Sequence, residues 1–154
     1  MGFLDFLYSS KHVIAKIDGK LIVLLLLIAS SVSVTGYAQT IRNTNNSTVA
    51  KIDNDGTVRN SNNSVIGRIS SNGDIRDSNN HYLGKMESDG DIRDSNNSYL
   101  GKVESNGTVR NKNNSTVGKV DSDGTVRDSN NHTIGYAKGV PMKYAAVYFF
   151  FGFF

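Results

Sequence analysis

Pairs of basic residues recur along this chain and are the side chains best suited to binding a ligand. Five times a lysine or arginine stands eight residues before an arginine: Lys51 and Arg59, Arg68 and Arg76, Lys85 and Arg93, Lys102 and Arg110, Lys119 and Arg127. Facing cations could bind phosphate, sulfate or the acid groups of a glycan. The alternative is that nearby acids neutralise them, because those acids fall two residues along the opposing strands. These acids are Asp53, Asp74, Glu87, Asp91, Glu104 and Asp121.

Other residues with chemical potential are better interpreted as turn residues. Loops such as Asp53-Asn54-Asp55-Gly56 offer oxygen ligands for calcium, but none has the full ligand series of an EF-hand. His81 and His132 occupy a position that serine fills in other copies. Tyr82, Tyr99 and Tyr136 could stack on sugar rings, although tyrosine also favours strands. With no cysteine and no phosphate-binding glycine loop, we expect no enzymatic activity, catalytic residue, metal or cofactor.

These candidates belong to a 17-residue unit that is repeated six times between Thr40 and about Gly139. The copies begin at Thr40, Thr57, Asp74, Asp91, Thr108 and Thr125. Each copy has an Asn-Asn turn, and most end in a second turn such as Ser88-Asp89-Gly90, with short strands between the turns. A three-residue loop ending in glycine sets Met86 opposite Ile92 and Lys85 opposite Arg93. The pattern predicts five such hairpins, flanked by outlying strands near Thr40 and Ile134.

A third apolar column has the wrong parity to share the core face of a regular strand. It comprises Val49, Ile66, Leu83, Leu100, Val117 and Ile134, and in five of these six cases a glycine follows. Glycine inside a strand commonly marks a bulge or bend. We expect each strand to bend there, which would turn the third column inward.

The N-terminal region is typical of a secretory signal peptide. Lys20 precedes the apolar run Leu21 to Ile28, and the small residues Gly36 and Ala38 follow it, which predicts cleavage before Gln39. An uncleaved membrane anchor is the alternative, although the run is short for a spanning helix. We therefore divide the chain into a lead and signal peptide (1–38), a repeat domain (39–139) and a C-terminal tail (140–154). A net charge of only +3 argues against nucleic-acid binding.

The repeat motif resembles that of the five-fold β-flower proteins, an exported bacterial family. The resemblance is carried by Val126-Arg127-Asp128-Ser129-Asn130-Asn131-His132-Thr133-Ile134-Gly135-Tyr136 and by the aromatic end Ala145-Ala146-Val147-Tyr148-Phe149-Phe150-Phe151. It implies a ring of β-hairpin petals about a pseudo-five-fold axis, and it implies no enzymatic activity or ligand. The alternative all-β fold is a β-solenoid, but stacked coils would align six arginines in one repelling row. Separate petals would keep these charges apart.

The tail, Tyr144 to Phe154, is too short for a membrane helix and rich in aromatic residues that favour strands. We predict that Val147 to Phe154 form a strand or extended plug on the apolar centre of the ring, within one subunit or exchanged between two. Exchange would make the tail a route to self-association, and attachment to a membrane or partner is the alternative.

The expected function is that of a non-enzymatic structural or interaction module of the bacterial cell envelope. Such a module would be periplasmic, outer-membrane-associated or secreted, with an envelope glycan or a protein as its partner. The competing expectation is an anionic-glycan- or polysaccharide-binding module that uses the paired basic residues.

Overall fold

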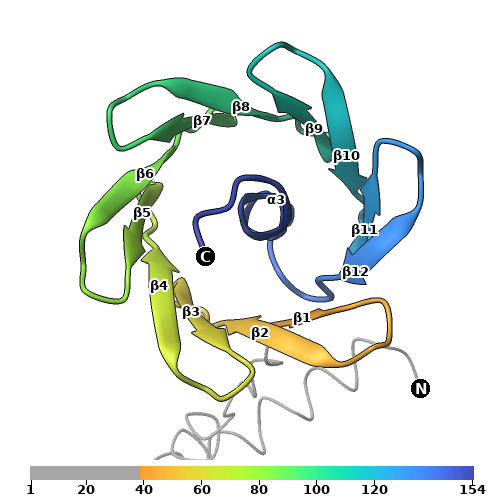
Figure 1. The fold of residues 1–154 in the computed structure, drawn as a ribbon, viewed down its shortest axis with the longest axis horizontal. Coiled ribbons are helices and arrows are strands. Elements are labelled where there is room, and N and C mark those ends of the chain that lie inside the picture. The colour runs from red at the N-terminus through yellow and green to blue at the C-terminus, as the bar shows by residue number, and fades with distance from the viewer. Residues whose placement is uncertain (1–38) are drawn as a thin grey trace, which may run out of the picture. The chain divides into compact units, whose positions relative to one another are not determined.

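The computed structural model describes residues 39–154, which belong to one compact unit. Twelve antiparallel strands close into a barrel, and one helix lies at its centre (Figure 1). The signal peptide predicted within residues 1–38 lies outside the described residues. The strands are β1 (Gln39–Arg42), β2 (Thr48–Ile52), β3 (Thr57–Asn60), β4 (Val65–Ile69), β5 (Asp74–Asp77), β6 (Tyr82–Met86), β7 (Asp91–Asp94), β8 (Tyr99–Val103), β9 (Thr108–Asn111), β10 (Thr116–Val120), β11 (Thr125–Asp128) and β12 (Thr133–Tyr136), and the helix is α3 (Met142–Phe150).

The turns that contain glycine set the register that the sequence predicts. Gly90 donates its N–H to the carbonyl oxygen of Glu87 at 3.0 Å and has a φ of 95°, the left-handed conformation required at the end of a three-residue loop. Across this turn Lys85 faces Arg93 and Met86 faces Ile92, as expected. The same partners recur as Lys51↔Arg59, Arg68↔Arg76, Lys102↔Arg110 and Lys119↔Arg127.

The predicted bulges are present at the third apolar column. Between β3 and β4, Val58 faces Gly67 but Arg59 faces Val65, so Ile66 is the extra residue. Equivalent shifts occur between β1 and β2, β5 and β6, β7 and β8, β9 and β10, and β11 and β12. All six residues of the third column are partly buried against the core. The bend therefore lets three apolar residues per repeat face inward.

The strands form one continuous barrel and not a set of separate petals. Each strand pairs with both of its neighbours, including β1 with β12. Continuous pairing leaves no free strand edge. The fold is also not the β-solenoid that we considered. Consecutive strands of the barrel are antiparallel, whereas a solenoid stacks identical positions of parallel coils.

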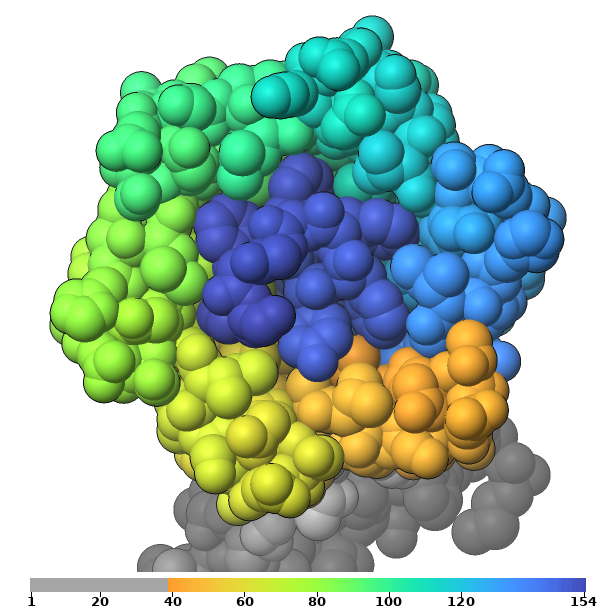
Figure 2. Space-filling model, in the orientation of Figure 1, coloured from red at the N-terminus to blue at the C-terminus, as the bar shows by residue number. Residues whose placement is uncertain are grey.

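The expectation of a strand or extended plug over Val147 to Phe154 is wrong for Val147 to Phe150, because these residues belong to the helix α3, Met142–Phe150. The predicted position of the tail is correct: Val147 is fully buried, and the aromatic residues that follow pack on the barrel core. Figure 2 shows the C-terminal residues filling the centre of the ring on the face in view. The closed barrel offers no strand edge, so an inserted strand would have unpaired backbone groups, whereas a helix satisfies its own. Tertiary context thus overrides the β propensity of the aromatic residues. Within the described residues, no helix is long and apolar enough to cross a membrane.

Candidate functional site

The ten candidate basic residues lie in facing pairs on strands whose alternate residues form the core. Ile52 and Val58 have no exposed surface, and their neighbours Lys51 and Arg59 face each other on the opposite side of the same strand pair. The other four pairs are placed in the same way. The structure therefore brings together each predicted pair, as five separate sites around the barrel.

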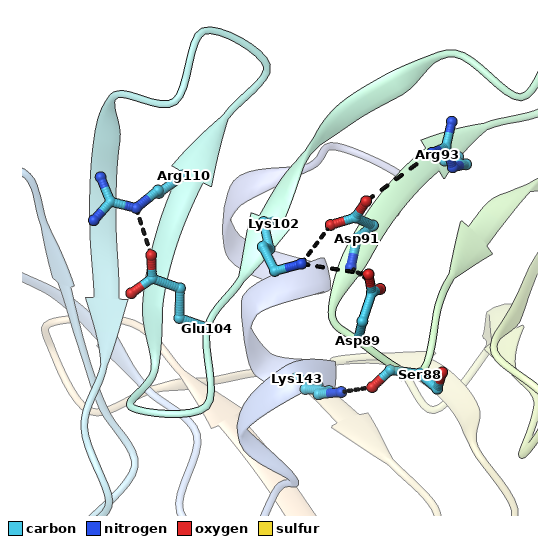
Figure 3. Close-up of polar contacts among 8 residues, drawn as sticks. All are labelled: Ser88, Asp89, Asp91, Arg93, Lys102, Glu104, Arg110 and Lys143. Carbon is cyan, nitrogen blue, oxygen red and sulfur yellow. Dashed lines mark hydrogen bonds and ion pairs between the residues drawn. The ribbon is translucent and has the colours of Figure 1, made fainter.

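Acidic side chains already neutralise most of these bases. Arg59 Nε lies 2.8 Å from Asp53 Oδ2, and Arg127 Nε lies 3.0 Å from Asp121 Oδ2. Figure 3 shows two further examples, in which Lys102 lies between Asp91 and Asp89 and Arg110 meets Glu104. All six acids named from the sequence take part in such pairs, and Lys51 is the one candidate base without an ion pair to residues 39–154.

The ion pairs shift the pKa values of Lys102 and Asp121 in the direction that favours the charged form of each group. The Asp91 carboxylate, which accepts a hydrogen bond from Lys102 at 2.7 Å, raises the pKa of that lysine. Hydrogen bonds from Lys119 and then Arg127 lower the pKa of Asp121. Because all these groups are partly exposed, each pair contributes little to stability. A ligand anion would nevertheless have to compete with the internal carboxylate.

Five of these arginines also bind the backbone of their own Asn-Asn turn, a role that the sequence analysis missed. In each, Nη1 donates to the carbonyl oxygen of the residue four positions later, at 3.1 to 3.4 Å. The acceptors are Asn63, Asn80, Asn97, Asn114 and Asn131, all of which have positive φ. The constant four-residue spacing in the sequence is the signal that could have revealed this role.

The Asn-Asn turns themselves are held by side chains. The residue that opens each turn accepts two backbone N–H groups, from two and four residues later, at 2.8 to 3.0 Å. These residues are Asn43, Asn60, Asp77, Asp94, Asn111 and Asp128. The backbone N–H of His132 is the largest cause of the lowered pKa of Asp128. Their oxygens are therefore engaged inside the turn.

Four of the remaining candidates, His81, His132, Tyr82 and Tyr99, also have local partners. His81 Nδ1 lies 2.9 Å from Asp77 Oδ2, within its own turn, and His132 Nδ1 lies 3.4 Å from Asp128 Oδ2. Among residues 39–154 no group of three or more histidine or acidic side chains is placed to hold a metal ion. The guanidinium of Arg76 lies 5.6 Å from the centre of the Tyr82 ring, and Arg93 lies 6.0 Å from that of Tyr99. These arginines cover one face of each ring, which leaves less of the ring free for a sugar.

Four of the five bulge glycines face the aromatic tail, a contact that only the structure reveals. A methyl group at Gly118 would lie 2.4 Å from Phe150 Cε1, and one at Gly67 would lie 2.3 Å from Phe154 Cε1. A methyl group at Gly84 would likewise lie against the ring of Phe153, and one at Gly135 against the ring of Phe149. These glycines thus serve two purposes, since they permit the strand bend and they leave room for the ring of a phenylalanine.

Comparison with known proteins gives one match. A family model described as "5-fold beta-flower protein" matches residues 32–154. No curated protein and no solved structure matches the chain.

Proposed function

The chain belongs to the 5-fold beta-flower family, and from that premise we propose that it is a non-enzymatic structural or interaction module, exported to the bacterial cell envelope. We include in this proposal the finer arrangement of the fold: six repeats build five hairpins around the glycine turns, and the outlying strands β1 and β12 complete the ring. Its location would be periplasmic, outer-membrane-associated or secreted. Nucleic acid is not among the proposed partners, which are an envelope glycan, a protein or a second copy of the chain joined through Val147 to Phe154.

One observation carries the non-enzymatic proposal. The polar side chains that recur in every repeat are used within the scaffold, as turn acceptors, as ion pairs and as arginine contacts to turn carbonyls. An enzyme needs an acid, base or nucleophile that is available to a substrate. Because these groups already bond one another within each repeat, a structural or interaction role explains them better than catalysis does.

The second candidate is recognition of an anionic glycan through the paired bases. Lys85 and Arg93 serve as the test pair, because their side chains are both near one-third exposed. A charge-assisted contact of Lys85 and Arg93 with a sulfate or carboxylate would have to be stronger than their existing ion pairs with Glu87 and Asp91.

A glycan array with the full chain distinguishes the two candidates. The structural proposal expects no binding that depends on Lys85 and Arg93. Binding that is lost in the Lys85→Ala/Arg93→Ala variant, but retained in the exposed control Lys112→Ala, would favour glycan recognition. Turnover of envelope polymers in a parallel hydrolysis panel would contradict both candidates.

Export has its own test. Expression of the full chain in a bacterial host, followed by fractionation and N-terminal sequencing, should recover a product that begins at Gln39 outside the cytoplasm. An uncleaved product in the cytoplasm would contradict export.

A further inference from the structure

The barrel departs from its repeat pattern where β12 meets β1, which we call the seam. Only one facing pair, Arg42↔Tyr136, joins these two strands, whereas three pairs join β2 and β3. A pocket of about 1280 Å³ lies beside this pair. It is lined by parts of β1 and β12, the 121–124 turn, and the 137–141 segment that leads to α3.

The seam also reverses a charge that most of the other repeats keep. In three repeats the arginine binds an acid six residues before it, as in Arg110 Nε with Glu104 Oε1 at 2.5 Å. That acid stands two residues after the lysine that faces the arginine, as in Lys102-Val103-Glu104. At the seam Tyr136 faces Arg42, and the residue two positions after Tyr136 is Lys138. A lysine therefore occupies the position of the acid.

No other acid of the repeat compensates for this reversal. Arg76 and Arg93 pair with an acid two residues before them, but the corresponding residue before Arg42 is Thr40. Among residues 39–154, the polar side-chain contact that Arg42 makes is from Nη1 to Asn46 Oδ1, at 3.1 Å. Arg42 thus bonds a neutral amide, and Lys138 is exposed.

Two carboxylates also line the pocket, and both have local partners. Asp121 lies 3.0 Å from both Lys119 Nζ and Arg127 Nε. Asp123 accepts the backbone N–H of Thr125 at 2.8 Å. Both carboxylates thus bond groups other than Arg42 and Lys138, and among residues 39–154 neither of these two bases forms an ion pair with them. Arg42 and Lys138 therefore stay available for an external anion.

We propose that the seam pocket binds one carboxylate-bearing saccharide, whose acid group takes the place of the acid that other repeats supply. Arg42 and Lys138 hold the carboxylate, the former through its planar fork of N–H groups. Tyr136 offers a ring to a sugar face, and Thr40, Asn46 and Ser122 offer polar groups to its hydroxyls. The volume exceeds what a single small anion needs and suits an oligosaccharide. This inference rests on the second candidate function and assigns it to one site outside the five basic pairs.

The test is calorimetric titration of the full chain with an oligogalacturonide, with a neutral oligosaccharide of equal length and inorganic sulfate as comparison probes. The key variant is Lys138→Glu, which restores the acid of the other repeats and provides Arg42 with an internal partner. We expect it to fold with at least the wild-type melting temperature and to bind the oligogalacturonide at least tenfold more weakly. Arg42→Ala should lose binding to a similar extent.

Two controls separate this proposal from the candidates above. Lys112→Glu makes the same charge change on an exposed residue outside the pocket and should bind like the wild type. The Lys85→Ala/Arg93→Ala variant should also bind normally. If only the latter variant lost binding, the glycan would bind the basic pairs and the seam proposal would be wrong.

Further outcomes would also overturn the seam proposal. Among them are absence of oligogalacturonide binding, equal binding of the neutral oligosaccharide, and binding that Lys138→Glu leaves unchanged. Absence of all binding would leave the structural proposal standing, since that proposal requires no glycan. Binding of inorganic sulfate as tight as that of the oligogalacturonide would also contradict a saccharide site.

Discussion

At the scale of single residues, polar side chains in this protein hold the backbone of their own turns. Asp77 accepts two backbone N–H groups of its turn, and Arg76 donates to the carbonyl oxygen of Asn80 at the turn's end. Asn80 has a φ of 69°, a conformation that asparagine adopts more readily than other residues with a Cβ. Short turns with so few internal contacts depend on each of these residues.

Replacing Asn80 by alanine should therefore destabilise the protein. Alanine is strained at positive φ, and we expect the free energy of unfolding to fall by about 1 kcal/mol. Chemical denaturation measures the change. Asn79→Ala is the matched control, because Asn79 is equally exposed and lacks positive φ, and Asn80→Gly should retain stability. Equal losses in Asn79→Ala and Asn80→Ala would contradict a conformational cause.

The glycine turns should make stability depend on acid pH. The backbone N–H groups of Thr57, Asp91 and Thr125 are the largest causes of lowered pKa values at Asp55, Asp89 and Asp123. A carboxyl with a lowered pKa in the folded state binds fewer protons than in the unfolded chain. Its stabilisation is complete above the ordinary value of 3.8 and is lost as the pH falls through the folded-state pKa.

Urea unfolding between about pH 2 and pH 7 tests this dependence. Two other repeats provide the control variant, because Asn72 and Asn106 occupy the same turn position and accept the same backbone bond. Changing Asp55, Asp89 and Asp123 together to asparagine should flatten the loss of stability below pH 4 and change stability little at pH 7. An unaltered acid profile would show that other carboxyl groups dominate.

At the scale of elements, the helix and the strands are matched through glycine. Gly118 faces Phe150, and a Cβ there would also lie 2.3 Å from the carbonyl oxygen of Arg127. The corresponding residue of β2 is Ala50, which is buried without difficulty. The room for a side chain at this strand position therefore differs from strand to strand. It is reduced where a phenylalanine ring of the tail lies against the strand.

Gly118→Ala should accordingly cost about 1–3 kcal/mol, as overpacking of a tight site does. The control is Ala50→Gly, where only the greater flexibility of glycine should matter, with a cost of about 1 kcal/mol or less. Thermal melting of both variants provides the comparison. A Gly118→Ala protein as stable as the wild type would show that the ring of Phe150 and the backbone at Arg127 both move aside without cost.

Deletion of residues 144–154 tests the contribution of the whole plug. Burial of each large apolar side chain contributes about 1.5–3 kcal/mol, and the total stability of a domain is about 5–15 kcal/mol. We expect a large fall in melting temperature or loss of folding. Val147→Ala is a milder variant, expected to cost about 1–3 kcal/mol, with the exposed residue Lys112→Ala, outside the tail, as control.

Sizing of the same proteins tests exchange of the tail between copies. A deletion product that kept the wild-type melting temperature and size would contradict a structural role and would favour attachment of the tail to a membrane or partner.

At the scale of the whole molecule, closure of the barrel decides how the ring is stabilised. The first and last strands meet at one facing pair, whereas the interior hairpins have regular three-pair registers. The segment that leads into the plug helix starts directly after β12. The ring is therefore closed by few strand-to-strand contacts at the seam, and the chain enters the plug helix from the same place.

Amide hydrogen exchange should show this difference. Backbone amides of β1 and β12 are expected to exchange at least tenfold faster than those of β6 and β7, because local opening there breaks fewer hydrogen bonds. Mass spectrometry of peptides from the exchanged full chain measures the effect. Uniform protection around the barrel would contradict a weak seam.

Residue spacing alone was enough to predict the three-residue turns that end in glycine and the register across them. Alternation of apolar and polar residues, together with a glycine at each three-residue loop, leaves one register that keeps Met86 and Ile92 on the same face. The acid that pairs with Arg110 was also evident, because Glu104 lies two residues along the opposing strand and such side chains are within reach. Lys102 instead pairs with Asp91, which faces it directly on its other neighbouring strand.

The tertiary structure alone decided what the tail becomes and how the ring closes. Aromatic residues favour strands locally, but a closed barrel has no edge with which Val147 or Phe150 could pair, so a helix forms in its centre. Likewise, the sequence contains Arg42 and Lys138 far apart, and only closure of β12 on β1 brings both to one pocket. Local pattern determines the repeating unit, whereas contacts between distant segments depend on how many units close the ring.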